Sequence, residues 1–346
     1  MSVTNSKRIR RRGASGGTVA RNRYYAGALS DHFDGVRFFN PGQPTTDRSL
    51  AALLRWRMGA GRSRWPSRVA NAPAAKPPAR VDGLSITMVG HATVLIQLAG
   101  TNLLVDPVWS KRASPLRWAG PKRVNDPGVA FTDLPPIDAV LITHNHYDHL
   151  DMATLRRLWS AHRPRFIAPL GNAPLIAKAI GTDTAETADW GDTIPIDDDI
   201  RVTVVPAHHW SARALGDRRM ALWCGFVIQS PAGLVYNVGD TGYGDGSIFP
   251  DIAKRFGAPD VAILPIGAYE PRWFMKEQHT DPDEAVRIMM ACGARQGLGV
   301  HWGTFQLTNE ARLAPKEALA AALRHHDIAP DRFIALEPGD VWFKIG

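Results

Sequence analysis

Three histidines and one aspartate stand close together directly after an apolar run at residues 139–142. They are His144, His146, Asp148 and His149, and they lie within a segment of six residues. Imidazole nitrogens and carboxylate oxygens are the usual protein ligands of zinc and of similar divalent ions. His144 and His146 are two residues apart, so both can turn toward one ion from a loop, while Asp148 and His149 can face a second ion. Packing gives little reason for polar residues at this density, so the segment predicts a metal site.

Three further polar residues each follow an apolar run farther along the chain, and these are His209, Asp240 and His301. In layered α/β folds, strand ends and the loops after them are where sites are built. Any one of these residues alone would be an ordinary buried polar group. Together with the dense segment they form a candidate set of seven ligands, more than the four of a single tetrahedral zinc site, which predicts two ions.

The elements that must position these residues begin near residue 85. Short runs rich in β-branched residues, separated by turn signals such as Gly90 and Gly100, predict strands. The predicted strands are residues 86–89, 94–98, 103–105, 139–142, 166–168, 202–205, 226–228, 235–238 and 261–264. Apolar residues at three- and four-residue spacing predict helices at 150–161, 247–256 and 282–291. Strand pairs followed by alternating strands and helices predict a layered α/β domain with mixed sheets.

The net charge of +8 is unevenly distributed along the chain. Residues 1–80 contain 16 basic and 3 acidic residues, whereas residues 81–346 contain 25 basic and 30 acidic ones. Residues 1–30 have no acid at all, and this composition predicts a disordered basic arm. Such an arm can bind anionic lipid or nucleic acid, or can be a solvated tail.

Residues 31–346 are predicted to form a single domain that contains the metal site, in which residues 31–80 are an extension that wraps the core. Trp56 and Trp65 stand among several arginines in this extension, so a membrane-surface patch is the alternative. No apolar run is long enough to cross a bilayer, and none follows the N-terminal charges as a secretory signal requires. We therefore expect a cytoplasmic protein, with peripheral membrane contact through the basic N-terminal region left open.

Residues 142–151, Ile-Thr-His-Asn-His-Tyr-Asp-His-Leu-Asp, resemble the signature loop of hydrolases with the metallo-β-lactamase fold. More specifically, they are similar to the N-acyl-phosphatidylethanolamine-hydrolysing phospholipase D family. Six further motifs resemble the same family, at residues 38–41, 90–93, 104–109, 239–243, 266–275 and 301–305. The resemblance covers most of residues 33–310. It implies an α/β fold built as a four-layer αβ/βα sandwich with two mixed sheets.

The resemblance also implies roles for the candidate ligands. The first metal would be held by His144, His146 and His209. The second would be held by Asp148, His149 and His301, with Asp240 bridging the two. Two zinc ions are the implied cofactors, with another divalent metal as the alternative, and Asp148 and Asp240 are the implied catalytic carboxylates. The family usually has a non-histidine where this chain has His208, so the ligand is assigned to His209, although the direction of each ring depends on the strand register.

Four other residues are weaker candidates for substrate contact or for support of the ligands. They are His91, Tyr269, Arg272 and His279, which lie in motifs shared with the resembled family. Arg272 and His279 could contact a phosphate, or could orient the candidate ligands by hydrogen bonds. The alternative is that residues 269–273 form an ordinary structured turn, because Arg and Trp also pack structurally.

The implied activity is a phosphodiesterase of phospholipase D type, in which two cations activate a water for attack on phosphorus. N-acyl phosphatidylethanolamine or a related phospholipid is the expected substrate. A lactonase or another ester hydrolase acting on a small soluble ester is the alternative. A nucleic-acid enzyme is less favoured, and no nucleic-acid partner is expected, because residues 81–346 have an excess of acidic over basic residues. Oligomerisation is left open.

Overall fold

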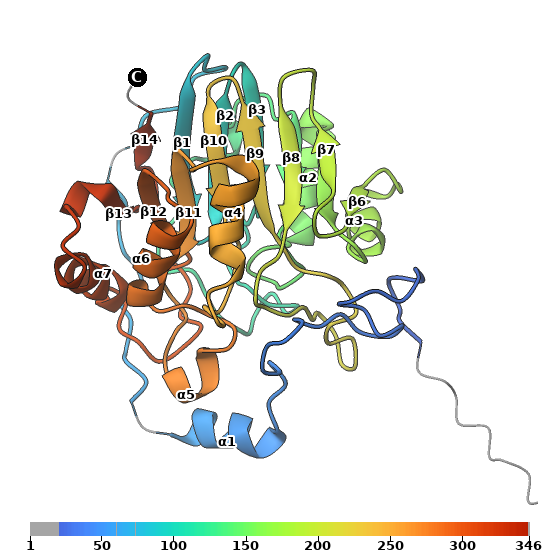
Figure 1. Ribbon diagram of the computed structural model, residues 1–346, viewed down its shortest axis with the longest axis vertical. Coiled ribbons are helices and arrows are strands. Elements are labelled where there is room, and N and C mark those ends of the chain that lie inside the picture. Colours follow the sequence, from blue (N-terminus) through green and yellow to red (C-terminus); the bar gives the residue numbers. More distant parts are fainter. Residues whose placement is uncertain (1–20, 60, 73, 345–346) are drawn as a thin grey trace, which may run out of the picture.

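Two mixed β-sheets of seven strands each stand face to face at the centre of the molecule (Figure 1). The computed structural model describes residues 21–59, 61–72 and 74–344. The first sheet contains β1 (Leu84–Gly90), β2 (Thr93–Leu98), β3 (Thr101–Val105), β4 (Ala139–Leu141), β5 (Arg165–Pro169), β6 (Glu186–Ala188) and β14 (Val341–Phe343). Its order is β14-β1-β2-β3-β4-β5-β6. Pairing is antiparallel from β14 to β3 and parallel from β3 to β6.

The second sheet repeats this arrangement of antiparallel and parallel strands. It contains β7 (Thr193–Pro195), β8 (Arg201–Val205), β9 (Gly225–Ser230), β10 (Gly233–Asn237), β11 (Val261–Pro265), β12 (Gln296–Val300) and β13 (Phe333–Ala335). Its order is β13-β12-β11-β10-β9-β8-β7, antiparallel from β7 to β10 and parallel from β10 to β13.

Helices cover the outer face of each sheet. The first sheet is covered by α2 (Met152–His162) and α3 (Ala173–Ile180), and the second by α4 (Ile248–Phe256), α6 (Pro282–Ala291) and α7 (Ala314–His325). Successive strand residues point to opposite faces, so Ile96 of β2 is buried between the sheets while Leu95 is buried under α2 and α3. The layers run helix, sheet, sheet, helix, and they confirm the predicted four-layer fold.

Helix α6 shows why its start could be predicted. The Asp281 side chain accepts a hydrogen bond from the backbone of Glu284, and the Glu284 side chain accepts one from the backbone of Asp281. This capping box satisfies N–H groups that the first turn of a helix leaves free. Pro282 then occupies the first helical position, where a missing N–H costs nothing.

The strand directions bring the candidate residues to one edge of the sandwich. In the first sheet, β1, β3 and β4 run in the same direction, and in the second sheet β8, β10, β11 and β12 do so. The loops that follow these strands carry the candidate ligands and meet between the two sheets. The hydrogen-bonded strands thus hold the ligand-bearing loops in fixed positions.

The N-terminal part of the chain differs from the prediction in two ways. Residues 1–20 of the predicted arm lie outside the described residues. Within residues 21–30, the side chains of Asn22, Tyr24 and Tyr25 contact the domain, whereas residues 26–30 are exposed. Asn22 is buried, and its Nδ2 donates to the carbonyl oxygens of Val36 (2.8 Å) and Met220 (2.9 Å). Three side chains thus hold residues 22–25 against the domain, which composition alone does not indicate.

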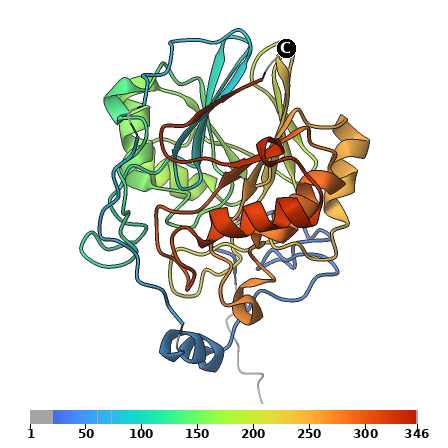
Figure 2. The same ribbon diagram turned by 90° about the vertical axis from the view of Figure 1, so that its left-hand side faces the viewer.

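The second difference is α1 (Leu50–Met58), which was not predicted. The Ser49 hydroxyl caps its first turn by accepting from the backbone N–H of Ala52. None of its residues is buried, so it has no apolar stripe facing a core that could have marked it in the sequence. Figures 1 and 2 both show α1 at the bottom of the molecule, beyond the body of the two sheets.

Candidate metal centre

The loop after β4 is held in place by Asp106, which follows β3. Asp106 Oδ1 accepts a hydrogen bond from Thr143 N (2.8 Å), and Oδ2 accepts from Thr143 Oγ1 (2.6 Å). Asp106 Oδ2 also lies 2.8 Å from Nδ1 of His149. With Nδ1 donating to this carboxylate, His149 presents the lone pair of Nε2 to the centre. Asp106 was not singled out from the sequence, although it follows an apolar run just as Asp240 does.

Loss of the Asp106 carboxylate should loosen the centre. We expect Asp106→Ala to lower metal affinity by about 10–100-fold, the usual cost of removing such a supporting partner. Asp106→Asn should lose less, because its amide oxygen can still accept one of these hydrogen bonds. Metal titration measures the affinity, and thermal unfolding shows whether each variant is still folded. Unchanged metal affinity in a folded Asp106→Ala protein would contradict the proposed support of His149 by Asp106.

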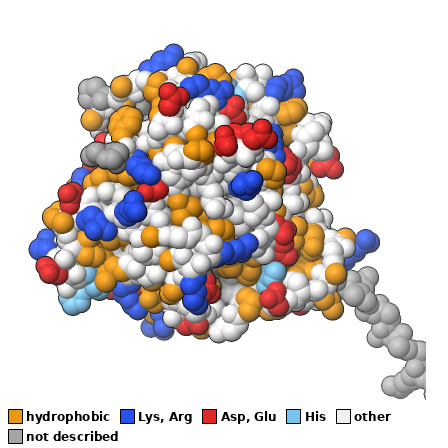
Figure 3. Space-filling view, turned by 45° about the horizontal axis from the view of Figure 1, so that its top comes forward, with side chains coloured by type: hydrophobic (Ala, Val, Ile, Leu, Met, Phe, Trp, Pro, Cys, Tyr) orange, Lys and Arg blue, Asp and Glu red, His pale blue; other side chains and the backbone are white. Residues whose placement is uncertain are grey.

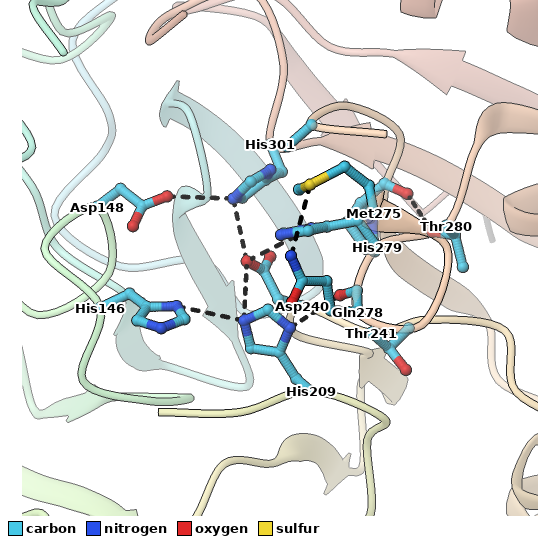
Figure 4. A network of polar contacts seen from close by, with 12 residues as sticks. His146, Asp148, His209, Asp240, Thr241, Met275, Gln278, His279, Thr280 and His301 are labelled. Atoms are coloured by element: carbon cyan, nitrogen blue, oxygen red, sulfur yellow. Dashed lines mark hydrogen bonds and ion pairs between the residues drawn. The ribbon is translucent and has the colours of Figure 1, made fainter. Parts of the chain in front are cut away.

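The first cluster consists of three imidazole rings. Nε2 of His144 lies 2.9 Å from Nδ1 of His146, and Nε2 of His209 lies 3.3 Å from the same atom. The other nitrogen of His209 lies 2.8 Å from the carbonyl oxygen of Gln278, which fixes the ring direction. Figure 4 shows His146 and His209 turned toward each other beside Asp240.

The second cluster is built around two carboxylates. Oδ2 of Asp148 lies 3.5 Å from Nε2 of His149 and 3.3 Å from Nε2 of His301. Oδ2 of Asp240 lies 3.2 Å from Nε2 of His149 and 3.1 Å from Nε2 of His301. The same Asp240 oxygen is 3.7 Å from Nε2 of His209 and 3.9 Å from Nε2 of His144. Asp240 therefore stands between the two clusters.

This donor set fits divalent cations. Imidazole nitrogens either donate or accept, so three of them directed at one spot cannot satisfy one another. Ligands about 2.0–2.1 Å from a tetrahedral zinc ion lie about 3.3 Å apart, close to the 2.9 and 3.3 Å separations of the first cluster. All seven side chains belong to groups whose ligand atoms lie within 4.8 Å of one another. The seven residues predicted from the sequence are thus brought together.

Electrostatics divides the histidines into two kinds. Burial lowers the pKa of His146 and that of His209 to about 3, so both rings are neutral, as metal ligation requires. Burial also acts to lower the pKa of His301, but the carboxylates of Asp240 and Asp148 outweigh it and raise that pKa to about 9. These carboxylates attract positive charge to the second cluster, and a divalent cation can supply it in place of a proton.

The structure separates His208 from His209. His209 belongs to the first cluster. His208 belongs to neither cluster, and its ring centroid lies 6.4 Å from that of Phe249. The backbone explains the difference, because His208 N donates to Thr241 Oγ1 and His208 O accepts from Gly242 N. This pairing with the loop after β10 sets which of the two rings turns inward.

The four weaker candidates occupy different places. Nε2 of His91 lies 2.9 Å from Oδ2 of Asp148, so His91 supports a candidate ligand. Nδ1 of His279 lies 3.9 Å from Oδ2 of Asp240, and Figure 4 shows the ring beside that carboxylate. Arg272 donates to the carbonyl oxygen of His279 (2.8 Å), so it orders the backbone and does not reach the centre.

Tyr269 lies away from the centre as well. It lines a separate hollow of about 380 Å³ together with Asp281 and His325. Burial raises the pKa of its hydroxyl well above the usual range, since the ring is enclosed by the fold. Substrate contact by Tyr269 is therefore not supported by its position.

A pocket of about 590 Å³ opens from the centre toward α1. Its floor includes His146, Asp148, Asp240 and His279. One set of wall residues is apolar and consists of Leu53, Trp56, Ala113, Trp210, Ala268, Phe274, Met275 and Leu307. Another set is basic and consists of Arg37, Arg48 and Arg218. Arg218 already has partners within the protein, because its Nε donates to Asp47 (2.7 Å) and its guanidinium lies 3.5 Å from the centroid of the Trp210 ring.

Comparison with known proteins agrees with this geometry. Residues 101–302 match the β-lactamase superfamily domain. The chain is 37% identical over 270 residues to an N-acyl-phosphatidylethanolamine-hydrolyzing phospholipase D of Caenorhabditis elegans, which covers 75% of this chain and 76% of that protein. It is 35% identical over 238 residues to a mitochondrial protein of the same description from Saccharomyces cerevisiae, covering 67% of this chain and 50% of the yeast protein.

Solved structures share the fold at lower identity. An isothiocyanate hydrolase from Delia radicum gut bacteria superposes with a TM-score of 0.58 at 20% identity, over 75% of this chain and 98% of that chain. A metallo hydrolase of Ignicoccus hospitalis superposes with a TM-score of 0.56 at 20% identity, over 76% and 99% of the two chains. The match to the β-lactamase superfamily domain and the identity to the two phospholipase D relatives show that the chain belongs to the β-lactamase superfamily, within its family of N-acyl-phosphatidylethanolamine-hydrolysing phospholipase D-like metal-dependent hydrolases.

Proposed function

We propose that this protein is a phosphodiesterase of phospholipase D type that acts on N-acyl phosphatidylethanolamine or a related phospholipid with two zinc ions. The observation that carries the proposal is the pocket, which joins a candidate two-metal floor to a largely apolar wall. A phospholipid has an anionic phosphodiester next to long apolar chains. The candidate metal floor of the pocket would face the phosphodiester. The apolar wall, which includes Leu53 and Trp56 of α1, would face the chains.

The seven clustered residues divide into two sets around Asp240. His144, His146 and His209 would hold one metal, and Asp148, His149 and His301 the other, with Asp240 reaching both. Two such cations would lower the pKa of a water molecule and stabilise negative charge on a phosphoryl group. Removing the metals with a chelator should therefore abolish turnover.

The protein's own groups orient the reactants. Oδ2 of Asp240 faces both clusters and can accept a hydrogen bond from the attacking water, which directs that water's lone pair toward phosphorus. His279 is buried, and its Nδ1 has no hydrogen-bond partner among the described residues, so it is placed to donate to a phosphoryl oxygen. The apolar wall of Trp56, Phe274 and Met275 can take up an acyl chain and exclude water from the floor.

The metal content of the loaded protein should be close to two ions per chain. The physical reason is that three imidazoles with one carboxylate oxygen, and two imidazoles with two carboxylates, each supply enough donors for a tetrahedral ion. Elemental analysis of active, fully loaded protein measures this directly. A value of one ion or fewer in active protein would contradict the two-metal centre.

The substrate class is tested by turnover of two kinds of compound. Metal-loaded protein is incubated with dispersed N-acyl phosphatidylethanolamine and, separately, with soluble lactones. We expect phosphatidic acid and N-acyl ethanolamine in equal amounts, together with slow or absent lactone opening. Faster lactone opening with no phospholipid cleavage would reassign the protein as an ester hydrolase of the same superfamily.

The N-terminal region supplies a second, weaker support for a lipid substrate. Arg55 and Arg57 lie in α1, and Trp56 of the same helix lines the pocket. Basic residues near an anionic membrane surface each contribute about 1 kcal/mol to binding. No helix within the described ranges is long and apolar enough to span a bilayer. We propose that contact with the membrane is peripheral and occurs on the α1 side.

A further inference from the structure

The loop of residues 111–122, between β3 and β4, presents two apolar side chains to solvent. Trp118 is 77% exposed and Leu116 is 44% exposed, and only Arg117 separates them in the chain. A tryptophan ring has one of the largest apolar surfaces of any side chain and is seldom left in water. Neighbouring exposed apolar groups at the tip of a loop mark an interaction surface.

Hydrogen bonds between its two ends fix the loop to the domain. Ala113 N donates to Pro121 O (3.0 Å), and Arg123 N donates to Lys111 O (3.0 Å). The Arg123 side chain is buried beneath the loop, where its Nη2 donates to Val108 O (2.8 Å). A loop fixed in this way loses little conformational freedom when it docks, which favours binding.

The charge of the loop is of one sign. Lys111, Arg112, Arg117 and Lys122 are all basic, and there is no acidic residue from 107 to 125. In the part of the chain that the structure describes, none of these four forms an ion pair with a carboxylate. A tryptophan and a leucine between unpaired cations match a bilayer interface, where apolar groups enter the lipid and cations meet phosphate groups.

The loop lies beside the mouth of the pocket. Ala113 lines the pocket above the candidate centre, and Arg112 and Lys122 line an adjoining hollow together with Trp56 and Arg57. The loop and α1 are therefore neighbours at the end of the molecule where the pocket opens. A surface that touches both would face the pocket mouth.

Helix α1 extends this surface. Leu50 is 79% exposed, Leu54 58% and Met58 81%, and Arg55 and Arg57 lie among them. The view in Figure 3 brings the opposite end of the molecule forward, and there hydrophobic, basic and acidic side chains are interspersed. Exposed apolar groups and cations thus lie side by side on α1.

We propose that the loop 111–122 is a docking element that inserts Leu116 and Trp118 into the surface of a bilayer containing anionic phospholipid. This rests on the proposed function, because an enzyme that cleaves phospholipids must reach them in a membrane. Docking through this loop and α1 brings the pocket mouth to the lipid headgroups, so a substrate can enter without leaving the bilayer entirely.

The test compares vesicle binding by the metal-loaded full chain and three variants. The first variant is Leu116→Ser/Trp118→Ser, the second is Arg117→Ser/Lys122→Ser, and the control is Phe343→Ser, an exposed apolar residue on β14 at the opposite end. Co-sedimentation is measured with vesicles of phosphatidylcholine and phosphatidylglycerol, at low and high salt. Turnover of a short-chain phospholipid below its micelle concentration is measured in parallel.

We expect the apolar double variant to bind vesicles at least about tenfold more weakly, since a lost tryptophan and leucine forfeit burial in lipid. The basic double variant should lose about tenfold at low salt and little at high salt, because salt screens the attraction. Phe343→Ser should bind like the parent, and all variants should turn over the dispersed substrate normally. Melting temperatures within a few degrees of the parent show that each variant is folded.

Two results would overturn the docking element and one would separate it from the proposed function. Parent-like vesicle binding by the apolar variant means that the loop does not dock. Absence of vesicle binding by the parent, with a change of oligomeric state in the variant, means that the tip contacts a second copy instead. Loss of vesicle binding in the variant while the parent cleaves no phospholipid supports the docking element but rejects the phospholipase activity.

Discussion

Replacing Asp240 by alanine is expected to lower kcat/KM by more than about a hundredfold. A residue that only supports a ligand already costs about 10–100-fold when removed, and Asp240 lies within both clusters. Without this carboxylate, His149 and His301 would also lose the charge that attracts a cation to them. Both metals should therefore bind more weakly, as shown by elemental analysis after dialysis.

The conservative substitution Asp240→Asn is the matched control. It keeps the size of the side chain and one oxygen, but it removes the negative charge. We expect it to retain the fold and part of the metal while losing most of the turnover. If Asp240→Ala kept two tightly bound ions and near-parental activity, Asp240 would have no bridging role and the centre would have to be divided differently.

The neighbouring histidines give the second large effect. His209→Ala is expected to remove one of the three nitrogens of the first cluster, so one metal should be lost and turnover should fall by more than about a hundredfold. His208→Ala should change turnover by no more than a few-fold, because its ring lies away from both clusters.

Paired measurements make this comparison sharp. Each variant is assayed for metal content, for turnover and for melting temperature. His208 is buried, so its removal leaves a cavity and is expected to lower stability by about 1–2 kcal/mol without loss of metal. Equal metal loss in the two variants would contradict the assignment of the inward-facing ring to His209.

Several parts of this protein were determined by local sequence. The run at 139–142 followed by His144 to His149 identifies a strand and a ligand-rich loop, because strand propensity and ligand chemistry are both properties of neighbouring residues. The helix Pro282–Ala291 was predicted at its true limits because Asp281 and Glu284 cap it locally. The predicted strands lie within or within one residue of those observed.

Other parts depended on partners far away in the chain. The short edge strands β6, β7, β13 and β14 and the helices α1, α3, α7 and α5 (Arg272–Met275) were not predicted. The edge strands and α5 have only three or four residues, and α1 has no buried residue, so none of these leaves a clear periodic pattern. The described residues 21–30 look like a flexible tail in composition. Residues 22–25 nevertheless contact the domain, because Asn22 finds acceptors 14 and 198 residues away and the Tyr24 hydroxyl donates to Asp217.

The centre shows the same division between local and long-range information. Residue types and spacing singled out all seven residues that the structure brings together, four in one segment after an apolar run and three that each follow an apolar run of their own. Three features depend on the packing of the two sheets. His209 turns toward the first cluster while His208 does not, Asp106 contacts His149, and Arg272 donates to the carbonyl oxygen of His279. Side-chain direction reverses with each residue of a strand and is set by backbone pairing with distant segments, so no local pattern contains it.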